Sequence, residues 1–195
     1  AHLGILGLVM PWNSGLEWKT AMLNYKHLGV FIALPRDKSQ ASNGITIDNR
    51  GQPIISYTMT VEDTKQTLIA LEAQCRVMRS AGATFQLSLY ENTPWCLDTD
   101  SDEIFEEFVK TTIQRGLVPS SIPLFSAHQM SSCRMHTNKT LGAVQTTGET
   151  WECDNLYVAD ASVMPTSLGI NPMLTVEAFA YMISKNVIQR LKDIE

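Results

Sequence analysis

The sequence is poor in charge and carries no cluster of positive charge. Fifteen Lys and Arg residues against twenty Asp and Glu residues give a formal net charge of −5, and charged residues make up 18% of the chain. Charges of both signs are scattered, without a basic block or stripe. Because a protein that binds DNA or RNA needs such a surface to neutralise phosphates, we expect no nucleic-acid partner.

Cysteines and long apolar runs are also scarce. The four cysteines are too few for a disulfide scaffold and form no C-x-x-C pair: they are Cys75, Cys96, Cys133 and Cys153. We expect them to be mostly reduced, which favours an intracellular protein. The longest apolar run near the start, residues 3–10, is too short to span a membrane and has no basic region before it, so we exclude a transmembrane helix or signal peptide there.

What the chain does contain is an ordinary globular composition. Hydrophobic residues make up 44% of its 195 residues, enough for a sizeable core in one domain or one and a half. The first residue is Ala1 rather than Met, and apolar sequence follows at once. We therefore expect a fragment that starts inside a longer protein.

Periodicity, capping residues and turn residues predict alternating helices and strands over the first 125 residues. Ser14-Gly15-Leu16-Glu17 has the form of a capping box, and Asp48-Asn49-Arg50-Gly51 is a turn between two short apolar runs. The predicted helices are 14–25, 60–82 and 101–116; the predicted strands are 27–34 (buried), 45–47 with 54–57 (a β-hairpin) and 84–90.

A proline- and serine-rich break at residues 119–123 marks a predicted domain boundary, which divides the chain into 1–125 and 126–195. Beyond it, residues 156–159 are predicted to form a short buried strand, and Pro172 is predicted to open a last helix. The predicted buried face of that helix consists of Met173, Val176, Ala180, Ile183 and Val187.

Residues 126–182 hold the side chains best suited to chemistry. His128 alone is a weak signal, since a single histidine is more often structural, but imidazole supplies a general base near neutral pH. Asn171-Pro172 allows two interpretations. Asparagine is a favoured helix N-cap and proline a favoured first helical residue, while a helix start also presents N–H groups that can hold a developing negative charge.

Two further alternatives stay open at this point. Asp160 follows the apolar strand and can either bind a ribose-like hydroxyl or cap the next turn. Cys133 and His136 form a C-x-x-H pair, with His128 upstream and Cys153 downstream, as in some zinc sites. Structural zinc usually shows two compact pairs, and only one is compact here, so we expect no metal.

The order and spacing of these residues resemble those of the glucose–methanol–choline (GMC) oxidoreductases. That family carries an H-x-x-G-T-C-x-M pattern, then an apolar strand that ends in Asp-Ala/Gly-Ser, then a second catalytic position, often as Asn-Pro. The matching residues here are His128, Cys133 and Met135; Asp160-Ala161-Ser162 and Pro165; and Asn171-Pro172 with Thr175. One departure is that Ser131-Ser132 replaces Gly-Thr, although small residues are retained, so we expect the backbone still to pass close to the flavin. Residues 11–15, 25–37 and 51–54 are in addition similar to long-chain fatty alcohol oxidases.

The resemblance implies an α+β fold: part of an antiparallel-sheet substrate-binding domain in 1–125, and the C-terminal strand and helix of an FAD-binding α/β domain in 126–195. It implies an FAD enzyme that oxidises a primary, long-chain alcohol to the aldehyde by hydride transfer to flavin N5, with O2 reduced to H2O2. By position, His128 and Asn171 are the catalytic residues. The expected contacts with the cofactor are made by Asp160, Ala161, Pro172 and Met173.

No G-x-G-x-x-G motif occurs in the chain, so we expect the N-terminal FAD-binding portion of the same enzyme to be a required partner. Two other functions stay open: another GMC alcohol or sugar dehydrogenase, and a non-catalytic fragment or paralogue that keeps the fold. The location is also open, with peripheral membrane association and a peroxisome among the intracellular possibilities.

Overall fold

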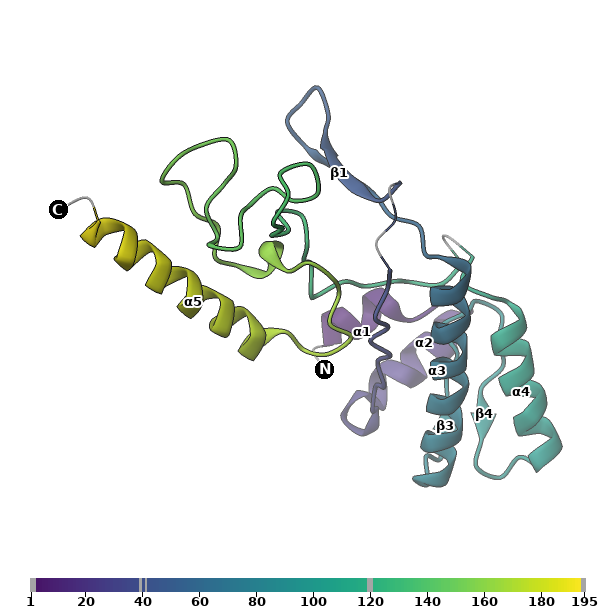
Figure 1. Cartoon of the computed structure of the whole chain (residues 1–195). Helices are drawn as coiled ribbons and strands as arrows, with labels where there is room; N and C mark the ends of the chain where they lie inside the picture. Colours follow the sequence, from purple (N-terminus) through teal and green to yellow (C-terminus); the bar gives the residue numbers. More distant parts are fainter. Residues whose placement is uncertain (1–2, 39, 41, 119–120, 194–195) are drawn as a thin grey trace. The chain divides into compact units, whose positions relative to one another are not determined.

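The computed structural model describes residues 3–38, 40, 42–118 and 121–193, and its elements belong to the α+β class (Figure 1). These ranges contain five α-helices and two antiparallel sheets of two strands each. The predicted α+β class with antiparallel pairing is thereby confirmed. None of the helices in these ranges is both long and apolar enough to cross a membrane.

The chain forms two compact units. The first consists of Ala1–Leu34 and Thr64–Phe125, and the second of Pro35–Asp63 and Ser126–Glu195. The chain passes from one unit to the other three times, and the boundary expected after residue 125 coincides with one of these passages. Pro35–Asp63, however, groups with the C-terminal residues rather than with the rest of 1–125. The division into substrate-binding residues 1–125 and flavin-binding residues 126–195 stays a prediction.

Helices around a small core make up most of the first unit. Its core consists of Cys75, Cys96, Phe105, Phe108 and Val109, all buried. The elements are α1 (Leu3–Val9), α2 (Gly15–Leu23), the 3-10 turn η1 (Tyr25–His27), most of α3 (Val61–Ser80), β3 (Phe85–Gln86), β4 (Cys96–Leu97) and α4 (Asp102–Gln114).

Side-chain caps set where these helices begin. The Ser14 hydroxyl accepts the Glu17 N–H at 3.2 Å, as the capping box predicts, and α2 starts there. The Asp63 N–H donates to the Thr60 hydroxyl at 2.9 Å at the start of α3. The three predicted helices of this part are confirmed, with ends shifted by one or two residues.

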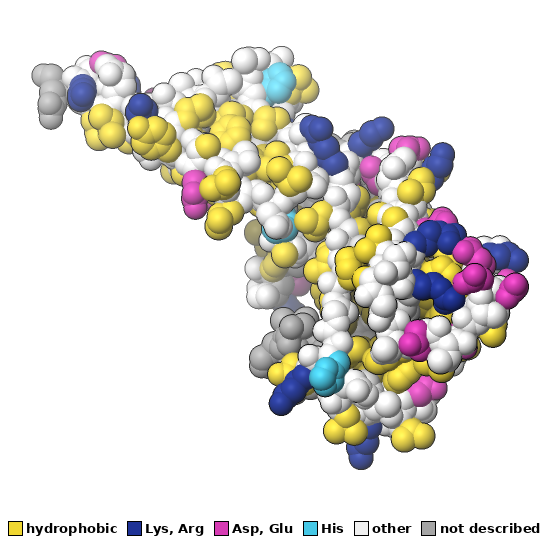
Figure 2. Space-filling model, turned by 90° about the horizontal axis from the view of Figure 1, so that it is seen from below, with side chains coloured by type: hydrophobic (Ala, Val, Ile, Leu, Met, Phe, Trp, Pro, Cys, Tyr) yellow, Lys and Arg dark blue, Asp and Glu magenta, His cyan; other side chains and the backbone are white. Residues whose placement is uncertain are grey.

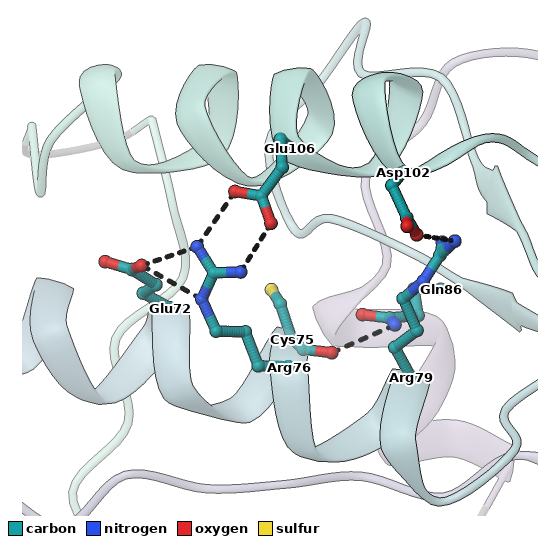
Figure 3. A network of polar contacts seen from close by, with 7 residues as sticks. All are labelled: Glu72, Cys75, Arg76, Arg79, Gln86, Asp102 and Glu106. Atoms are coloured by element: carbon teal, nitrogen blue, oxygen red, sulfur yellow. Dashed lines mark hydrogen bonds and ion pairs between the residues drawn. The ribbon is translucent and has the colours of Figure 1, made fainter.

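A network of polar contacts joins α3 to α4 above that core (Figure 3). Arg76 on α3 is paired with Glu72 of its own helix at 2.8 Å and with Glu106 of α4 at 2.6 Å. Arg79 pairs with Asp102 at 3.0 Å, and its guanidinium lies 4.5 Å from the centre of the Phe105 ring. The two arginines therefore link α4 to α3, mostly through exposed ion pairs, which stabilise a fold only weakly.

Two predicted strands differ from the structure. Residues 28–34 form no strand, and Val30 and Ile32 are 57% and 75% exposed, so the prediction of a buried strand at 27–34 is wrong. A β-branched apolar run favours extended backbone, but it becomes a strand only beside another backbone that accepts its hydrogen bonds. Of residues 84–90, only Phe85–Gln86 pairs, with β4.

The predicted β-hairpin is present in the second unit. β1 (Gly44–Ile47) pairs with β2 (Pro53–Ser56), with Ile45 opposite Ile55. One Asp48 carboxylate oxygen accepts the N–H groups of Arg50 and Gln52, each at 2.8 Å, which holds the turn. Isoleucines on both faces of the hairpin are exposed, and hydrophobic side chains reach the surface widely on the face drawn in Figure 2.

The remainder of the second unit is loop-rich and closed by a long helix. Its elements are the 3-10 turn η2 (Ala161–Val163) and α5 (Met173–Lys192), and its core is Met135, Val144, Val163 and Ile183. The strand predicted at 156–159 is wrong: only Tyr157 forms a bridge, with Glu149, and Leu156 is 52% exposed. This segment bonds to neighbouring loops, Thr150 and Gly148, rather than to an extended strand.

The predicted buried face of α5 is only partly correct. Ile183 is buried, and Val176, Ala180 and Val187 are half-buried, but Met173 is 66% exposed. Met173 stands in the first turn, beyond the end of the core that Ile183 contacts. The helix is therefore held at its middle, and its N-terminal turn projects past the core.

Gly148 lies close to α5, and this approach generates a stability prediction. The residue has a φ of +89°, and a Cβ there would lie 2.7 Å from Ile183. Gly148→Ala combines left-handed strain of about 1–3 kcal/mol with overpacking of about 1–3 kcal/mol. We expect a loss of at least about 2 kcal/mol in the free energy of unfolding, measured by denaturant titration.

Gly51→Ala is the matched control, since Gly51 has a φ of +76° in the same unit and nothing within 4 Å of the added Cβ. The loss of unfolding free energy in Gly51→Ala reflects backbone strain alone. Equal losses in the two variants would mean that the contact between Gly148 and Ile183 does not hold α5 in place.

Candidate functional site

Backbone hydrogen bonds bring two distant parts of the motif together. The Cys133 N–H donates to the Ser162 carbonyl at 3.0 Å, and the Met135 N–H donates to the Val163 carbonyl at 2.8 Å. A longer contact of 3.4 Å joins the Ser131 N–H to the Ala161 carbonyl. Residues 131–135 therefore lie alongside η2, and His128 precedes this pairing by three residues.

The paired segments pack on a buried apolar core. Met135, Val144 and Val163 are at most 8% exposed, and Ile183 of α5 packs against them. Gly142 allows its loop to approach the segment of His136 closely, because a Cβ at position 142 would lie 2.6 Å from the His136 Cβ. Figure 1 shows these loops, in green, along one side of α5. The core thus holds irregular backbone in a defined place.

Asp160 caps η2. One of its carboxylate oxygens accepts the Ser162 hydroxyl at 2.5 Å and the Ser162 N–H at 2.8 Å. These two hydrogen bonds, the side-chain one first, lower the pKa of Asp160 from its ordinary value. Of the two roles open to this residue, capping is therefore realised, and the carboxylate retains its second oxygen for other donors.

His128 is half-buried in irregular backbone. Among the described residues, its imidazole forms no hydrogen bond or ion pair. The two ring nitrogens are the groups of this side chain that can form hydrogen bonds.

Asn171, Pro172 and Met173 stand at the start of α5, but not as expected. Pro172 occupies the N-cap position, without a side-chain cap, and the first helical bond runs from the Val176 N–H to the Pro172 carbonyl at 2.8 Å. The interpretation of Asn171 as the N-cap is therefore wrong, because the helix begins one residue later than an Asn cap requires. Asn171 is exposed, and no hydrogen bond within the described residues links residues 171–173 to His128 or Asp160.

The same geometry leaves donors free. The N–H groups that precede Val176 in α5 have no acceptor in the helix, and no acidic residue stands in its first turn. The positive end of the helix therefore faces a ligand or solvent without compensation from the chain.

Arg36 is a residue that sequence reasoning missed. Its Nε donates to the Ser167 carbonyl at 3.0 Å, and Gly169, with φ +68°, lies so close that a Cβ would be 2.9 Å from the Arg36 Cβ. These contacts hold the loop that leads to Asn171. The partners are 131 residues apart, and no local sequence signal could have revealed the pair.

Ser131 has an unusual conformation. Its φ is +73°, a left-handed value that non-glycine residues adopt at a cost on the order of 1–3 kcal/mol. Its hydroxyl oxygen is buried and has no hydrogen-bond partner. The signal in the sequence was the departure from Gly-Thr, since glycine is the residue that this backbone favours.

Residues considered for zinc have other roles. The His136 Nδ1 accepts the Asn138 N–H at 2.9 Å, and all four cysteines are free. Within the part of the chain that the structure describes, no group of three or more His, Cys, Asp or Glu side chains could hold a metal ion.

Capping by Asp160 leads to a stability prediction. Asp160→Ala loses both bonds to Ser162 and should lower the free energy of unfolding by about 1 kcal/mol, whereas Asp160→Asn, an equivalent cap, should lose much less. Because the folded pKa is lowered, the carboxylate contributes stability above about pH 4, which disappears as the pH falls through the folded pKa. Denaturant titrations at pH 7 and pH 3 test both statements. If the loss of unfolding free energy in Asp160→Ala is as large at pH 3 as at pH 7, the statement on pH is contradicted.

Comparison with known proteins identifies the family. Residues 39–180 match the family model described as GMC oxidoreductase. The chain is 38% identical to long-chain-alcohol oxidase FAO4A of Arabidopsis thaliana, covering 98% of this chain and 26% of that protein. It is 33% identical to long-chain-alcohol oxidase FAO1 of the same plant, covering 97% and 25%.

The fold is also similar to a solved structure of formate oxidase from Aspergillus oryzae, a study of FAD modification in that enzyme. The TM-score is 0.51 at 18% identity, covering 81% of this chain and 26% of that one. The chain therefore spans about a quarter of the length of the relatives that it matches.

Proposed function

Because this chain belongs to the GMC oxidoreductase family, we propose that it forms the substrate and catalytic part of an FAD-dependent oxidase of long-chain primary alcohols. The observation that carries the proposal is the backbone pairing of residues 131–135 with η2. It joins the segment that follows His128 to the turn that Asp160 caps, which supports the assignment of both residues to one site. The assignment to long-chain alcohols rests on the two Arabidopsis relatives.

The residues present fit a flavin. The start of α5 offers N–H groups without acceptors and no acidic side chain, which suits a cofactor that becomes negatively charged. The buried Ser131 hydroxyl has no partner in the protein. We assign Asp160 and Ala161 to the ribityl or phosphate region, and Pro172 and Met173 to the neighbourhood of the ring.

Bound FAD would supply the hydride acceptor, at N5, for oxidation of the alcohol carbon, and O2 would be the final oxidant, with H2O2 as its product. The protein supplies the proton chemistry and the alignment. A ring nitrogen of His128 takes the hydroxyl proton of the alcohol, a role typically worth about 10²–10⁴ in rate. The Asn171 side-chain amide donates a hydrogen bond to the same oxygen and holds the alcohol in line, and the loop clamped by Arg36 limits its movement.

The rest of such an enzyme is part of the proposal. The relatives are about four times longer than this chain, and a Gly-rich phosphate-binding loop does not occur in its sequence. We assign the remaining contacts with the dinucleotide phosphates to that further polypeptide. Peripheral association with a membrane, the source of long-chain alcohols, belongs to the same proposal.

The function is tested first at His128. In the flavin-loaded enzyme, His128→Ala should slow reduction of the flavin by alcohol at least about 100-fold, because no other group takes the hydroxyl proton. Rapid-mixing absorbance under anaerobic conditions measures the rate. Since the imidazole makes no hydrogen bond in the described structure, the unfolding midpoint should stay near that of wild type.

His27→Ala is the matched control, an exposed histidine at the end of η1 in the other unit. The flavin of this variant should be reduced by alcohol at the wild-type rate. Wild-type reduction in His128→Ala would assign His128 a structural role, and an enzyme that binds FAD but is reduced by no alcohol would indicate a non-catalytic protein.

Substrate class is tested with a series of primary alcohols. Each methylene that enters an apolar tunnel contributes about 0.8 kcal/mol, so kcat/KM should rise severalfold per added carbon from butanol to decanol, until the tunnel is full. Steady-state peroxide formation measures the series, with glucose as the comparison substrate. A flat series together with strong activity on glucose would instead favour a sugar oxidoreductase of the same family.

A further inference from the structure

The β-hairpin of the second unit has an apolar face that is exposed in the described chain. The strand register places Ile45 opposite Ile55 and Ile47 opposite Pro53, so their side chains lie on one face of the hairpin. Ile45, Ile47 and Ile55, named here the isoleucine face, are 60%, 73% and 72% exposed. The other face is mostly small or polar and consists of Gly44, Thr46, Ile54 and Ser56. Such alternation is typical of a strand pair with one buried side and one solvent side.

Hydrogen bonds hold this hairpin at both ends. Asp48 holds the turn, and at the open end the Thr58 N–H donates to the Asn43 side-chain oxygen at 2.8 Å while the Asn43 amide donates to the Thr58 carbonyl at 3.0 Å. A two-stranded hairpin is nevertheless marginally stable in water unless a third strand or a helix packs on it. Its sheet has two strands, and every residue of both is exposed. The hairpin is therefore a formed element whose apolar face needs cover.

The accessible surface of the chain indicates how large the covering partner is. The chain has a mass of 21.7 kDa and an accessible surface of 13520 Å². A compact monomer of this mass exposes about 9,200 Å², and two separate globules of half the mass would together expose about 11,100 Å². Because the second figure already assumes no contact between the two units, the excess of about 2,400 Å² does not depend on how they are placed. One partner contributes about this much to a large, permanent interface.

A further polypeptide of the same enzyme is the occupant that these facts favour. The chain spans 26% and 25% of the two Arabidopsis relatives, so most of such an enzyme lies outside these 195 residues. A membrane surface fits less well, because membrane-binding segments usually carry clustered basic residues. The two strands hold no charged residue, and the turn between them pairs one acidic residue, Asp48, with one basic residue, Arg50.

We infer that the isoleucine face packs against the further polypeptide of the same enzyme and is buried there, while the face that carries Thr46 stays in water. The inference rests on the proposed function in one respect, that this chain is part of a longer enzyme. It needs neither the assigned catalytic residues nor the assigned flavin contacts, because the hairpin contains none of them.

Burial of the isoleucine face is tested by thiol labelling of the full-length flavoenzyme. Ile45→Cys should react with a maleimide at least about 100-fold more slowly than Thr46→Cys, because a buried thiol is reached only when the interface opens. Thr46→Cys is the matched control, since Thr46 is the next residue and lies on the other face. Mass spectrometry of the hairpin peptide separates these thiols from the four natural cysteines. Equal labelling rates at the two positions overturn the inference.

The identity of the occupant is tested by photo-crosslinking. The photoreactive residue p-benzoylphenylalanine replaces Ile47 in the full-length enzyme, or Ile55 if the first variant does not fold, and mass spectrometry locates the link. We expect a link to a segment of the same molecule outside these 195 residues. A link within them, a link to a second copy, or a link to lipid when vesicles of equal parts phosphatidylcholine and phosphatidylserine are present overturns the inference. The absence of any link overturns it as well, since nothing then packs on this face.

Flavin reduction in the same preparations distinguishes this failure from that of the proposed function. If alcohol reduces the flavin but no link leaves the 195 residues, only the interface is wrong. If the expected link forms in an enzyme that no alcohol reduces, the interface is correct and the proposed activity is wrong.

Discussion

The candidate site depends on one interaction, the backbone pairing of residues 131–135 with η2. The two bonds from Cys133 and Met135 are of ordinary length, 3.0 and 2.8 Å, and they join segments some thirty residues apart. They adjoin a core of buried apolar side chains, which includes Met135 and Val163 of the paired segments themselves. Without this pairing, His128 and Asp160 would belong to two independent loops.

The core below explains how loops rather than strands can hold a site. Val144 and Val163 are fully buried between irregular segments, and Ile183 closes them from α5. Gly148 lets that helix approach because it has no Cβ. The N-terminal turn of α5 then extends beyond the core, and its first N–H groups have no acceptor within the helix.

The first unit is held together by a different set of interactions. Its core is small, and charge pairs at its rim, Arg76 with Glu106 and Arg79 with Asp102, connect α3 to α4. Burial raises the pKa of the Cys75 thiol to about 11, so it stays protonated and serves as an apolar core residue. The residues with candidate chemistry all lie in the second unit.

The sequence by itself determined what depends on neighbours along the chain. The capping box at Ser14, the hairpin turn at Asp48 and the helices that follow Thr60 and Ser101 form as predicted, because the groups that bond lie within four residues of each other. The order of His128, Asp160 and Asn171 likewise indicated the family. Only the tertiary structure decided that 28–34 and 156–159 are not strands, that Asn171 is not a cap, and that Arg36 clamps the loop before it. A strand needs a partner backbone, and a clamp needs a residue 131 positions away; such partners are chosen by packing of the whole chain, which local propensity does not encode.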